Sequence, residues 1–319
     1  MQSYAILDAR TPGIVNIISN KNCKRWRIDA LRKNVSVSVR RLFWEDNMNQ
    51  KCVRRLSICV MAMILIFGLV GCSSDTEDIF ILDTDEMTKQ IHDGMYGIER
   101  VKITANVATI ADGYFSGFYD LKYIEVAEDN EKYQSINGVL YTKDGSALVA
   151  YPMAKDENVY TIPDECVAVY SYAFAGSKLE RIVLSDEMHE IGYYSFNNCD
   201  GLTSMNIPRK VYYISAGAFA NCDNLEFLSV DDENQYYVDI DGVLFNSQKD
   251  ALHTYPGGKK DSSYVLPDTC KTIREYSFSG CLYLKEVVMS ENVNIGDNAF
   301  LESDIEIVQI SEDAINIEQ

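Results

Sequence analysis

Three histidines, nine cysteines and 48 acidic residues are the side chains from which this chain could build a catalytic or metal site. The histidines, His92, His189 and His253, fall in three different segments, and His189-Glu190 lacks the second histidine of a metalloprotease helix. The sequence contains no Gly-x-Ser-x-Gly, no Walker loop and no dinucleotide fingerprint. Pairs of acids are expected in so acidic a chain and do not indicate a glycosidase. We therefore predict that the protein is not an enzyme and has no catalytic residues and no cofactor.

Five cysteines follow Cys72, and three of them, Cys199, Cys222 and Cys281, each lie three residues after a phenylalanine. In an exported protein such cysteines can oxidise to disulfides. Their number is odd, however, and the sequence has no Cys-x-x-Cys pair or cysteine–histidine cluster that would indicate a metal site. We expect buried free thiols, with disulfides as the alternative and no metal.

Two acidic runs, residues 128–131 and 231–234, lie 104 residues apart. Carboxylates are the hard oxygen ligands that Ca²⁺ prefers, but these runs lack the alternating spacing of an EF-hand loop. We interpret both runs as solvated turns, with calcium binding as the alternative.

Charge is spread unevenly along the chain. Residues 1–71 hold 12 Lys/Arg and 4 Asp/Glu, so the remainder holds 17 basic and 44 acidic residues, a net charge of −27. A body this acidic repels phosphate backbones, so we expect no nucleic-acid partner.

A secretory signal occupies residues 48–71. Basic residues between positions 51 and 55 precede an apolar run over residues 56–70, which is short for a membrane span of about 20 residues. Its end, Leu69-Val70-Gly71-Cys72, resembles the lipobox of bacterial lipoproteins, in which the cysteine is acylated and becomes the mature N-terminus. The resemblance implies lipidation at Cys72; an uncleaved anchor and an ordinary signal peptide are the alternatives.

Residues 1–47 lie upstream of this signal. Back-translation of residues 44–48 gives a purine-rich run directly ahead of Met48, as a ribosome-binding sequence requires. We predict that translation starts at Met48 and that residues 1–47 are a non-native upstream extension or are disordered.

An internal repeat is marked by six phenylalanines, which are spaced by 59, 22, 23, 59 and 22 residues: Phe115, Phe174, Phe196, Phe219, Phe278 and Phe300. A unit of about 23 residues cannot bury its apolar positions alone, so each unit must stack on its neighbours as one coil of a solenoid. The alternating end of each unit, such as Ile182-Val183-Leu184, predicts a short parallel strand with every second side chain inward.

Written as I-P-x-x-V-x-x-I-x-x-x-A-F-x-x-C-x-x-L-x-x-I, the repeat resembles the BspA-like leucine-rich repeats of bacterial surface proteins over about residues 101–310. The resemblance implies a right-handed leucine-rich repeat solenoid, of the α/β class but mostly β, with about six coils of 22–23 residues over residues 101–319. Residues 72–100 are then a lipidated tether and an N-terminal cap, for which we predict a short helix from about Asp83 to Gly94.

Both 59-residue gaps contain about 36 extra residues with the same apolar hairpin, residues 137–152 and 241–256. Their 104-residue offset equals the sum of three successive phenylalanine spacings, 59, 22 and 23 residues. A block of three coils was therefore duplicated together with its hairpin. In the first copy we predict strands over residues 139–142 and 147–151 with Asp144-Gly145 as the turn. Because the apolar frame is kept while the tips differ, we predict an architectural insertion packed on the flank of the solenoid, with a second binding surface as the alternative.

Outward side chains of the parallel strands form the candidate binding surface, since solenoids of this kind present them as a continuous face. Exposed Tyr, Phe, Val and Ile beside isolated charges are typical of protein-binding surfaces, although such positions also vary without any partner. The candidate residues are Tyr123, Glu125, Arg181, Val183, Ser204, Asn206, Phe227, Ser229, Glu286 and Val288, continued by Ile307 and Gln309. Tyrosine pairs at 193–194, 212–213 and 236–237 are expected to cover the coil edge, with a sticky surface as the alternative.

Together these features predict a lipoprotein that is exported, anchored in the bacterial cell envelope through the lipid on Cys72 and exposed at the surface. There it would act as a protein-binding or adhesion module for a host or envelope protein. The alternative is a structural or accessory lipoprotein that scaffolds another bacterial protein.

Overall fold

The computed structural model describes residues 79–83, 86–87 and 95–310, together with the backbone of three strands nearer the N-terminus. The chain divides into two units, residues 1–84 and 85–319, and each is described by itself. The predictions about the signal at residues 48–71, the lipid on Cys72 and the start at Met48 lie outside the described residues. No helix in the described part of the chain is long and apolar enough to cross a membrane.

Four strands are described in the first unit. They are β1 (Tyr4–Leu7), β2 (Ile14–Ile18), β3 (Trp26–Asp29) and β4 (Ile79–Leu82). Strand β2 pairs antiparallel with β1 and β3, and β4 runs parallel to β1. Three of these strands fall within residues 1–47, and whether that segment is translated in cells stays a prediction.

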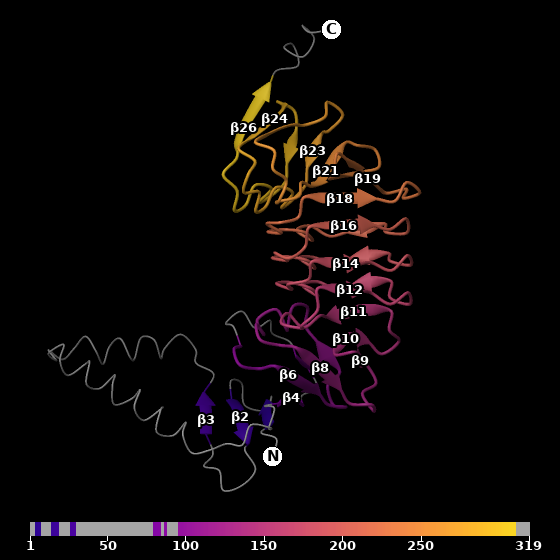
Figure 1. Ribbon diagram of the computed structural model, residues 1–319, viewed down its shortest axis with the longest axis vertical. Coiled ribbons are helices and arrows are strands. Elements are labelled where there is room, and N and C mark those ends of the chain that lie inside the picture. Colours follow the sequence, from indigo (N-terminus) through magenta and orange to yellow (C-terminus); the bar gives the residue numbers. More distant parts are fainter. Residues whose placement is uncertain are drawn as a thin grey trace, which may run out of the picture. The chain divides into compact units, whose positions relative to one another are not determined.

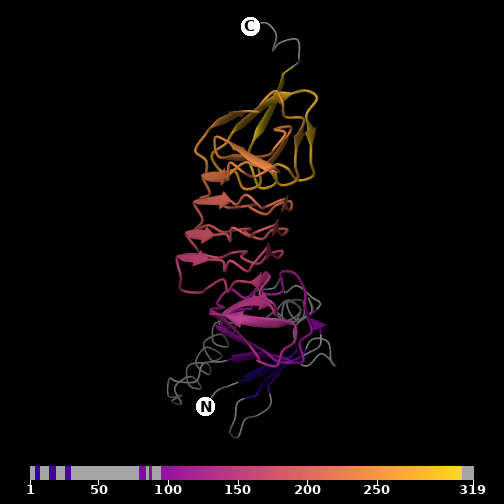
Figure 2. The ribbon, with the colours of Figure 1, turned by 90° about the vertical axis from the view of Figure 1, so that its right-hand side faces the viewer.

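The second unit is a solenoid whose coils stack along one axis (Figures 1 and 2). Most coils contribute one long and one short strand. The long strands are β6 (Arg100–Ile103), β8 (Tyr123–Val126), β12 (Val159–Thr161), β14 (Arg181–Val183), β16 (Ser204–Ile207), β18 (Phe227–Val230), β22 (Ser263–Val265), β24 (Glu286–Ser290) and β26 (Glu306–Ile310). The short strands are β5 (Glu86–Met87), β7 (Thr109–Ile110), β13 (Ala168–Val169), β15 (Glu190–Ile191), β17 (Tyr213–Ile214), β23 (Thr272–Ile273) and β25 (Asn294–Ile295).

All regular elements of the described chain are strands, so the solenoid is mostly β as predicted. Prolines follow the long strands, where a missing N–H removes no ladder bond: Pro163 follows β12, Pro208 follows β16 and Pro267 follows β22. The predicted cap helix is wrong at Glu86 and Met87, because β5 pairs there in parallel with β7 and extends the short-strand series. The rest of that predicted helix, apart from Asp83, lies outside the described residues.

A column of stacked aromatic rings forms the centre of the core. The centroids of Phe174 and Phe196 are 5.3 Å apart, as are those of Phe196 and Phe219, and both pairs are stacked. Tyr151 continues the column at 5.2 Å from Phe174, and it lies 23 residues before that phenylalanine. Tyr255 stacks in the same way at 5.3 Å from Phe278. Tyr151 and Tyr255 therefore occupy the ring position of two further coils.

Each predicted hairpin belongs to one of these further coils, so the prediction that it packs on the flank of the solenoid is wrong. Strand β11 (Ala147–Ala150) pairs in parallel with β13, as one short strand pairs with the next. Strand β21 (Ala251–Thr254) pairs with β23 in the same way. The hairpins are built into the stack because Tyr151 and Tyr255 complete its ring column.

The hairpin is also longer than predicted, since a third strand precedes it. In the first copy β9 (Tyr133–Ile136), β10 (Val139–Thr142) and β11 form an antiparallel meander. In the second copy β19 (Tyr237–Ile240) and β20 (Val243–Asn246) precede β21. The two-residue turn between the first two strands has positive φ at both positions, 51° and 83° at Asn137-Gly138 and 52° and 79° at Asp241-Gly242. Such a turn matches the strand twist and needs Asn or Asp followed by Gly.

These meanders divide the solenoid into blocks. Hydrogen-bonded long strands fall into separate sets before, between and after the meanders, and β18 does not pair with β22. The buried apolar residues likewise fall into one cluster from Val139 to Leu244 and another from Val243 to Ala299. We call the coils with β12, β14, β16 and β18 the middle block. The outward face of the parallel strands is therefore interrupted, which the sequence analysis did not predict.

Candidate functional site

The middle block presents four long strands side by side, β12, β14, β16 and β18 (Figure 1). Their registers align Val159 with Arg181, Thr161 with Val183, and Ser204 with Phe227. Inward residues of these strands are buried, whereas outward ones are mostly exposed, because successive side chains of a strand point to opposite sides. The alternation predicted from the sequence is confirmed here.

Apolar side chains on this outward face are partly exposed to solvent. Val159 is 42% exposed, Val183 is 40% exposed and Phe227 is 44% exposed. The exposed side chain of Arg181 lies beside Val159 in the register. Aromatic and aliphatic groups around an isolated arginine are the composition of protein-binding surfaces rather than of a solvated sheet face.

Of the ten candidate residues, six lie together on this face: Arg181, Val183, Ser204, Asn206, Phe227 and Ser229. The other four do not join them. Tyr123 and Glu125 lie on β8, in the set of strands before the first meander. Glu286 and Val288 lie on β24, after the second meander.

Two candidate aromatic residues also support the meanders. A Cβ on Gly138 would lie 2.4 Å from the Tyr123 ring, and a Cβ on Gly242 would lie 2.4 Å from the Phe227 ring. The rings therefore lie against the two-residue turns, and the guanidinium of Arg100 lies 5.0 Å from the centroid of Tyr123. Tyr123 and Phe227 consequently have an architectural role that the sequence analysis did not identify.

Polar candidate residues contact neighbouring strands. Lys102 pairs with Glu125 at 2.6 Å, Ser229 Oγ donates to Asn206 Oδ1 at 3.0 Å, and Ser263 Oγ donates to Glu286 Oε1 at 2.9 Å. Because these groups are solvent-exposed, such contacts add little to stability and serve mainly to orient the side chains.

Ile307 and Gln309 are exposed on β26, as predicted, but they do not continue the outward series. The parallel register aligns them with Val287 and Met289, whose side chains are buried, so Glu306 and Val308 occupy the outward register positions of β26. The error arose because the last described coil is shorter: Val287 and Ile307 are only 20 residues apart in the sequence.

Val159 and Thr161 are exposed residues of the face that the sequence analysis missed. They lie between the hairpin at residues 137–152 and Phe174, where no outward residues were predicted. A signal was present, because Ile162-Pro163 repeats the strand ending at Ile207-Pro208. That match marks β12 as one more long strand.

All five described cysteines are buried and free, which confirms the expected thiols. The thiols donate to carbonyls: Cys199 Sγ to Phe174 O at 3.2 Å and Cys222 Sγ to Phe196 O at 3.0 Å. Burial raises the pKa of Cys166 to about 11, so its thiol is protonated near neutral pH. Cys199 and Cys222 therefore connect neighbouring coils.

The acidic runs are turns held by an asparagine. Asn130 is buried and its Nδ2 donates to the carbonyls of Thr104 and Val107 at 2.7 and 3.0 Å. Asn234 makes the same two contacts with Pro208 and Val211 at 2.8 and 3.0 Å. In the part of the chain that the structure describes, no group of three His, Cys, Asp or Glu side chains could hold a metal ion.

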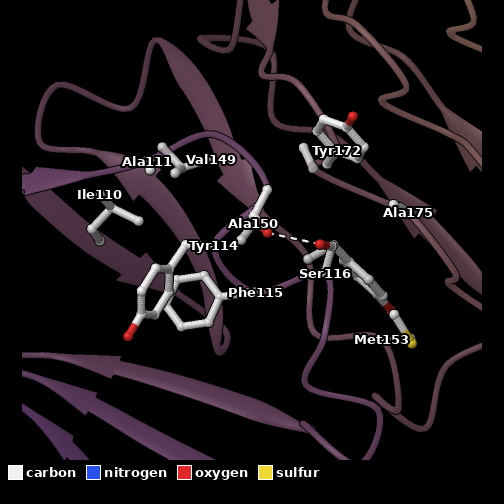
Figure 3. Close-up of a pocket in the computed structure, with 13 residues that line it drawn as sticks. Ile110, Ala111, Tyr114, Phe115, Ser116, Val149, Ala150, Met153, Tyr172 and Ala175 are labelled. Atoms are coloured by element: carbon white, nitrogen blue, oxygen red, sulfur yellow. Dashed lines mark hydrogen bonds between the residues drawn. The ribbon is translucent and has the colours of Figure 1, made fainter. Parts of the chain in front are cut away.

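A small cavity lies where the first meander meets the preceding coil (Figure 3). Its lining includes Tyr114 and Phe115 from the preceding coil, Met153 from the chain after β11, and Tyr172 and Ala175 from the next coil. The cavity has about 10 Å³, which is about the space that one water molecule needs. This cavity is therefore too small for an organic ligand.

Comparison with known proteins identifies the repeat. The family model described as the BspA type leucine rich repeat region matches six copies over residues 156–248 and 258–319. No curated protein matches the sequence significantly.

Solved structures that resemble the chain include three bacterial proteins. A leucine rich cell surface protein from Faecalibacterium prausnitzii has 19% identity and a TM-score of 0.48, with 71% of this chain and 65% of that chain covered. The pneumococcal vaccine antigen PcpA has 21% identity and a TM-score of 0.49, with 72% and 57% covered. A leucine-rich repeat protein from Eubacterium ventriosum has 19% identity and a TM-score of 0.41, with 67% and 61% covered.

The chain thus spans 57–65% of the length of these three solved proteins. The coil spacing, the ring column and the family match agree with one another. Over residues 156–248 and 258–319 the chain therefore consists of BspA-type leucine-rich repeats.

Proposed function

We propose that this chain is an exported, lipid-anchored protein of the bacterial cell envelope that binds another protein through the long-strand face of its middle block. The observation that carries the proposal is the uncovered apolar group of Val159, Val183 and Phe227 beside Arg181. Burial of such side chains drives protein association, and the arginine adds a polar contact of defined geometry.

Binding of a protein fits the rest of the molecule better than binding of a small molecule or nucleic acid. The one cavity described above holds about a single water, and the chain after residue 71 carries a net charge of −27. A flat strand face suits a protein surface, which is also broad and flat. BspA-like repeats occur in bacterial surface proteins, which agrees with this use.

The anchoring proposal rests on the signal sequence and on Cys72. Metabolic labelling of the full chain with a radioactive fatty acid tests it. We expect the label in the wild-type protein and its loss in Cys72→Ala, whereas Cys52→Ala, within the same signal, should keep it. Label that persists in Cys72→Ala would exclude this anchor.

Photo-crosslinking from the strand face tests the binding proposal. A benzophenone amino acid at position 183 of the full chain should give a crosslinked partner on intact cells or with host matrix protein. Position 265 is the control, since Val265 is 65% exposed on β22 outside the middle block. Equal crosslinking from both positions would reject the face.

Protease treatment of intact cells then distinguishes the two roles. An adhesion module should be cleaved by external protease, whereas an accessory lipoprotein facing inward should be shielded from it.

A further inference from the structure

A second exposed face of the middle block is rich in tyrosine. It is the outward side of the short strands β13, β15 and β17, and its tyrosines are Tyr170, Tyr212, Tyr213 and Tyr236, between 41% and 52% exposed. We call it the tyrosine face. These four rings are not part of the central ring column.

The backbone register places the tyrosines around a set of small side chains. Parallel pairing aligns Ala168 with Glu190 and Glu190 with Tyr213. One residue beyond each short strand come Tyr170, Gly192 and Ser215 in successive coils. A Cβ on Gly192 would lie 2.6–2.8 Å from the backbone of residues 169–171, so these neighbouring coils pack closely beside Tyr170.

At the other edge of the face the rings form a row. Centroids of His189 and Tyr212 are 5.7 Å apart, and those of Tyr212 and Tyr236 are 6.1 Å apart. The Tyr212 hydroxyl donates to Glu190, which holds this carboxylate beside the row of rings.

Charge on the face is negative. Burial raises the pKa of Tyr170, and the nearby carboxylates of Asp112, Asp144 and Glu190 raise it further. Asp144 accepts from the hydroxyls of Thr142 and Ser146, which helps to hold its pKa near 2, so it is ionised at neutral pH. Within residues 95–310 none of the three carboxylates forms a salt bridge.

The duplicated block shows that the fold does not require these side chains. At the 104-residue offset Tyr170 corresponds to Arg274 and Glu190 to Asn294, while Ala216 and Gln248 replace Asp112 and Asp144. The strand registers are the same in both copies, because Ala251 aligns with Thr272 and Thr272 with Asn294. The aromatic and acidic side chains around Tyr170 are therefore not repeated in the duplicated block, and the strand register does not depend on them.

We propose that the tyrosine face binds an extended, lysine- and arginine-rich segment of a partner protein. Cationic side chains are attracted both to the faces of tyrosine rings and to carboxylates that lack a salt-bridge partner. Complementary charge accelerates encounter and makes binding sensitive to salt. The residues of this surface differ from those of the long-strand face, so the two binding proposals can be rejected independently.

The test is the binding of a labelled peptide of alternating lysine and glycine to the full chain, followed by fluorescence anisotropy. We expect binding that weakens about tenfold when salt is raised from about 50 mM to about 300 mM. Its glutamate counterpart should not bind. The variant Tyr170→Arg with Glu190→Asn carries the residues of the duplicated block, and in it we expect the affinity for the lysine peptide to fall about tenfold.

The double variant Glu291→Gln with Asp297→Asn is the control for an effect of net charge alone on the affinity. Both residues are exposed in the last described coil, and the pair changes the charge by the same two units. This variant should keep the affinity of the wild type. The proposal is overturned if the lysine peptide does not bind, if the tyrosine-face variant binds it as well as the wild type, or if the control loses as much affinity. Thermal unfolding of each variant confirms that it is folded.

Discussion

At the scale of single residues, the polar and thiol side chains that could take part in chemistry mostly stabilise the fold. Asn130 and Asn234 hold turns, three of the five described cysteines bond to carbonyls of the preceding coil, and Gly138 and Gly242 accept aromatic rings against their backbone. Repetition explains this pattern, because every coil must satisfy the same backbone groups at its turns.

Gly242→Ala tests the contact between ring and turn. The φ of 79° already strains a non-glycine residue, and the Cβ would lie 2.4 Å from the Phe227 ring. We expect the free energy of unfolding to fall by about 2–4 kcal/mol, as measured with urea. Gly97→Ala is the matched control, since its φ is 76° and nothing lies within 4 Å; it should lose only about 1 kcal/mol. Equal losses would mean that the ring contact has no effect.

His253 gives the stability a dependence on pH. It is buried, its Nε2 lies 2.9 Å from Ile214 O, and burial followed by the charge of Arg274 lowers its pKa to about 4. An unfolded histidine titrates near 6.5, so the unfolded chain takes up the proton first. The contribution of His253 to the free energy of unfolding is therefore fully present above pH 6.5. As the pH falls from 6.5 towards 4, about 3 kcal/mol of it is lost.

Urea unfolding between pH 7.5 and 4.5 measures this loss. In His253→Gln the steep part of the dependence should disappear, while the titration of carboxylates remains. An unchanged slope in the variant would show that another group is responsible.

At the scale of elements, the meanders are coils of the solenoid. Their tyrosines complete the ring column, and β11 and β21 take the place of short strands. The sequence predicted strands over residues 139–142 and 147–151, and the structure has them at 139–142 and 147–150, because their apolar alternation is local. It did not predict their place in the stack, because the repeat was traced through phenylalanine alone, although Tyr151 keeps the 23-residue spacing to Phe174.

Tyr255→Ala tests whether the second meander belongs to the core. The ring is 2% exposed and stacks on Phe278, so we expect its removal to lower the free energy of unfolding by about 3–5 kcal/mol. Tyr255→Phe keeps the ring and removes only the bond to Asp261 Oδ2 at 2.9 Å, which should lower it by about 1 kcal/mol. If the second meander only lay on the flank of the solenoid, it would unfold separately, and the midpoint of the main unfolding transition would be the same in Tyr255→Ala as in the wild type.

At the scale of the whole molecule, the 104-residue duplication made two blocks with one fold and different surfaces. The solenoid and the outward alternation of its strands could be predicted from the sequence, since both follow from the spacing of buried residues. The interruption of the strand face could not, because it depends on how each meander pairs with the coils beside it. Six candidate residues therefore share one face, and four lie elsewhere.

The central claim is that the long-strand face of the middle block binds a protein. The most direct measurement is the affinity of the full chain for the partner identified by crosslinking, compared between Val183→Asp and Val265→Asp. Both valines are exposed on long strands, so neither change should affect folding. We predict that Val183→Asp weakens binding at least about tenfold, or about 1.4 kcal/mol, while Val265→Asp leaves it unchanged. Wild-type affinity in Val183→Asp, or the same loss in both variants, would contradict the account.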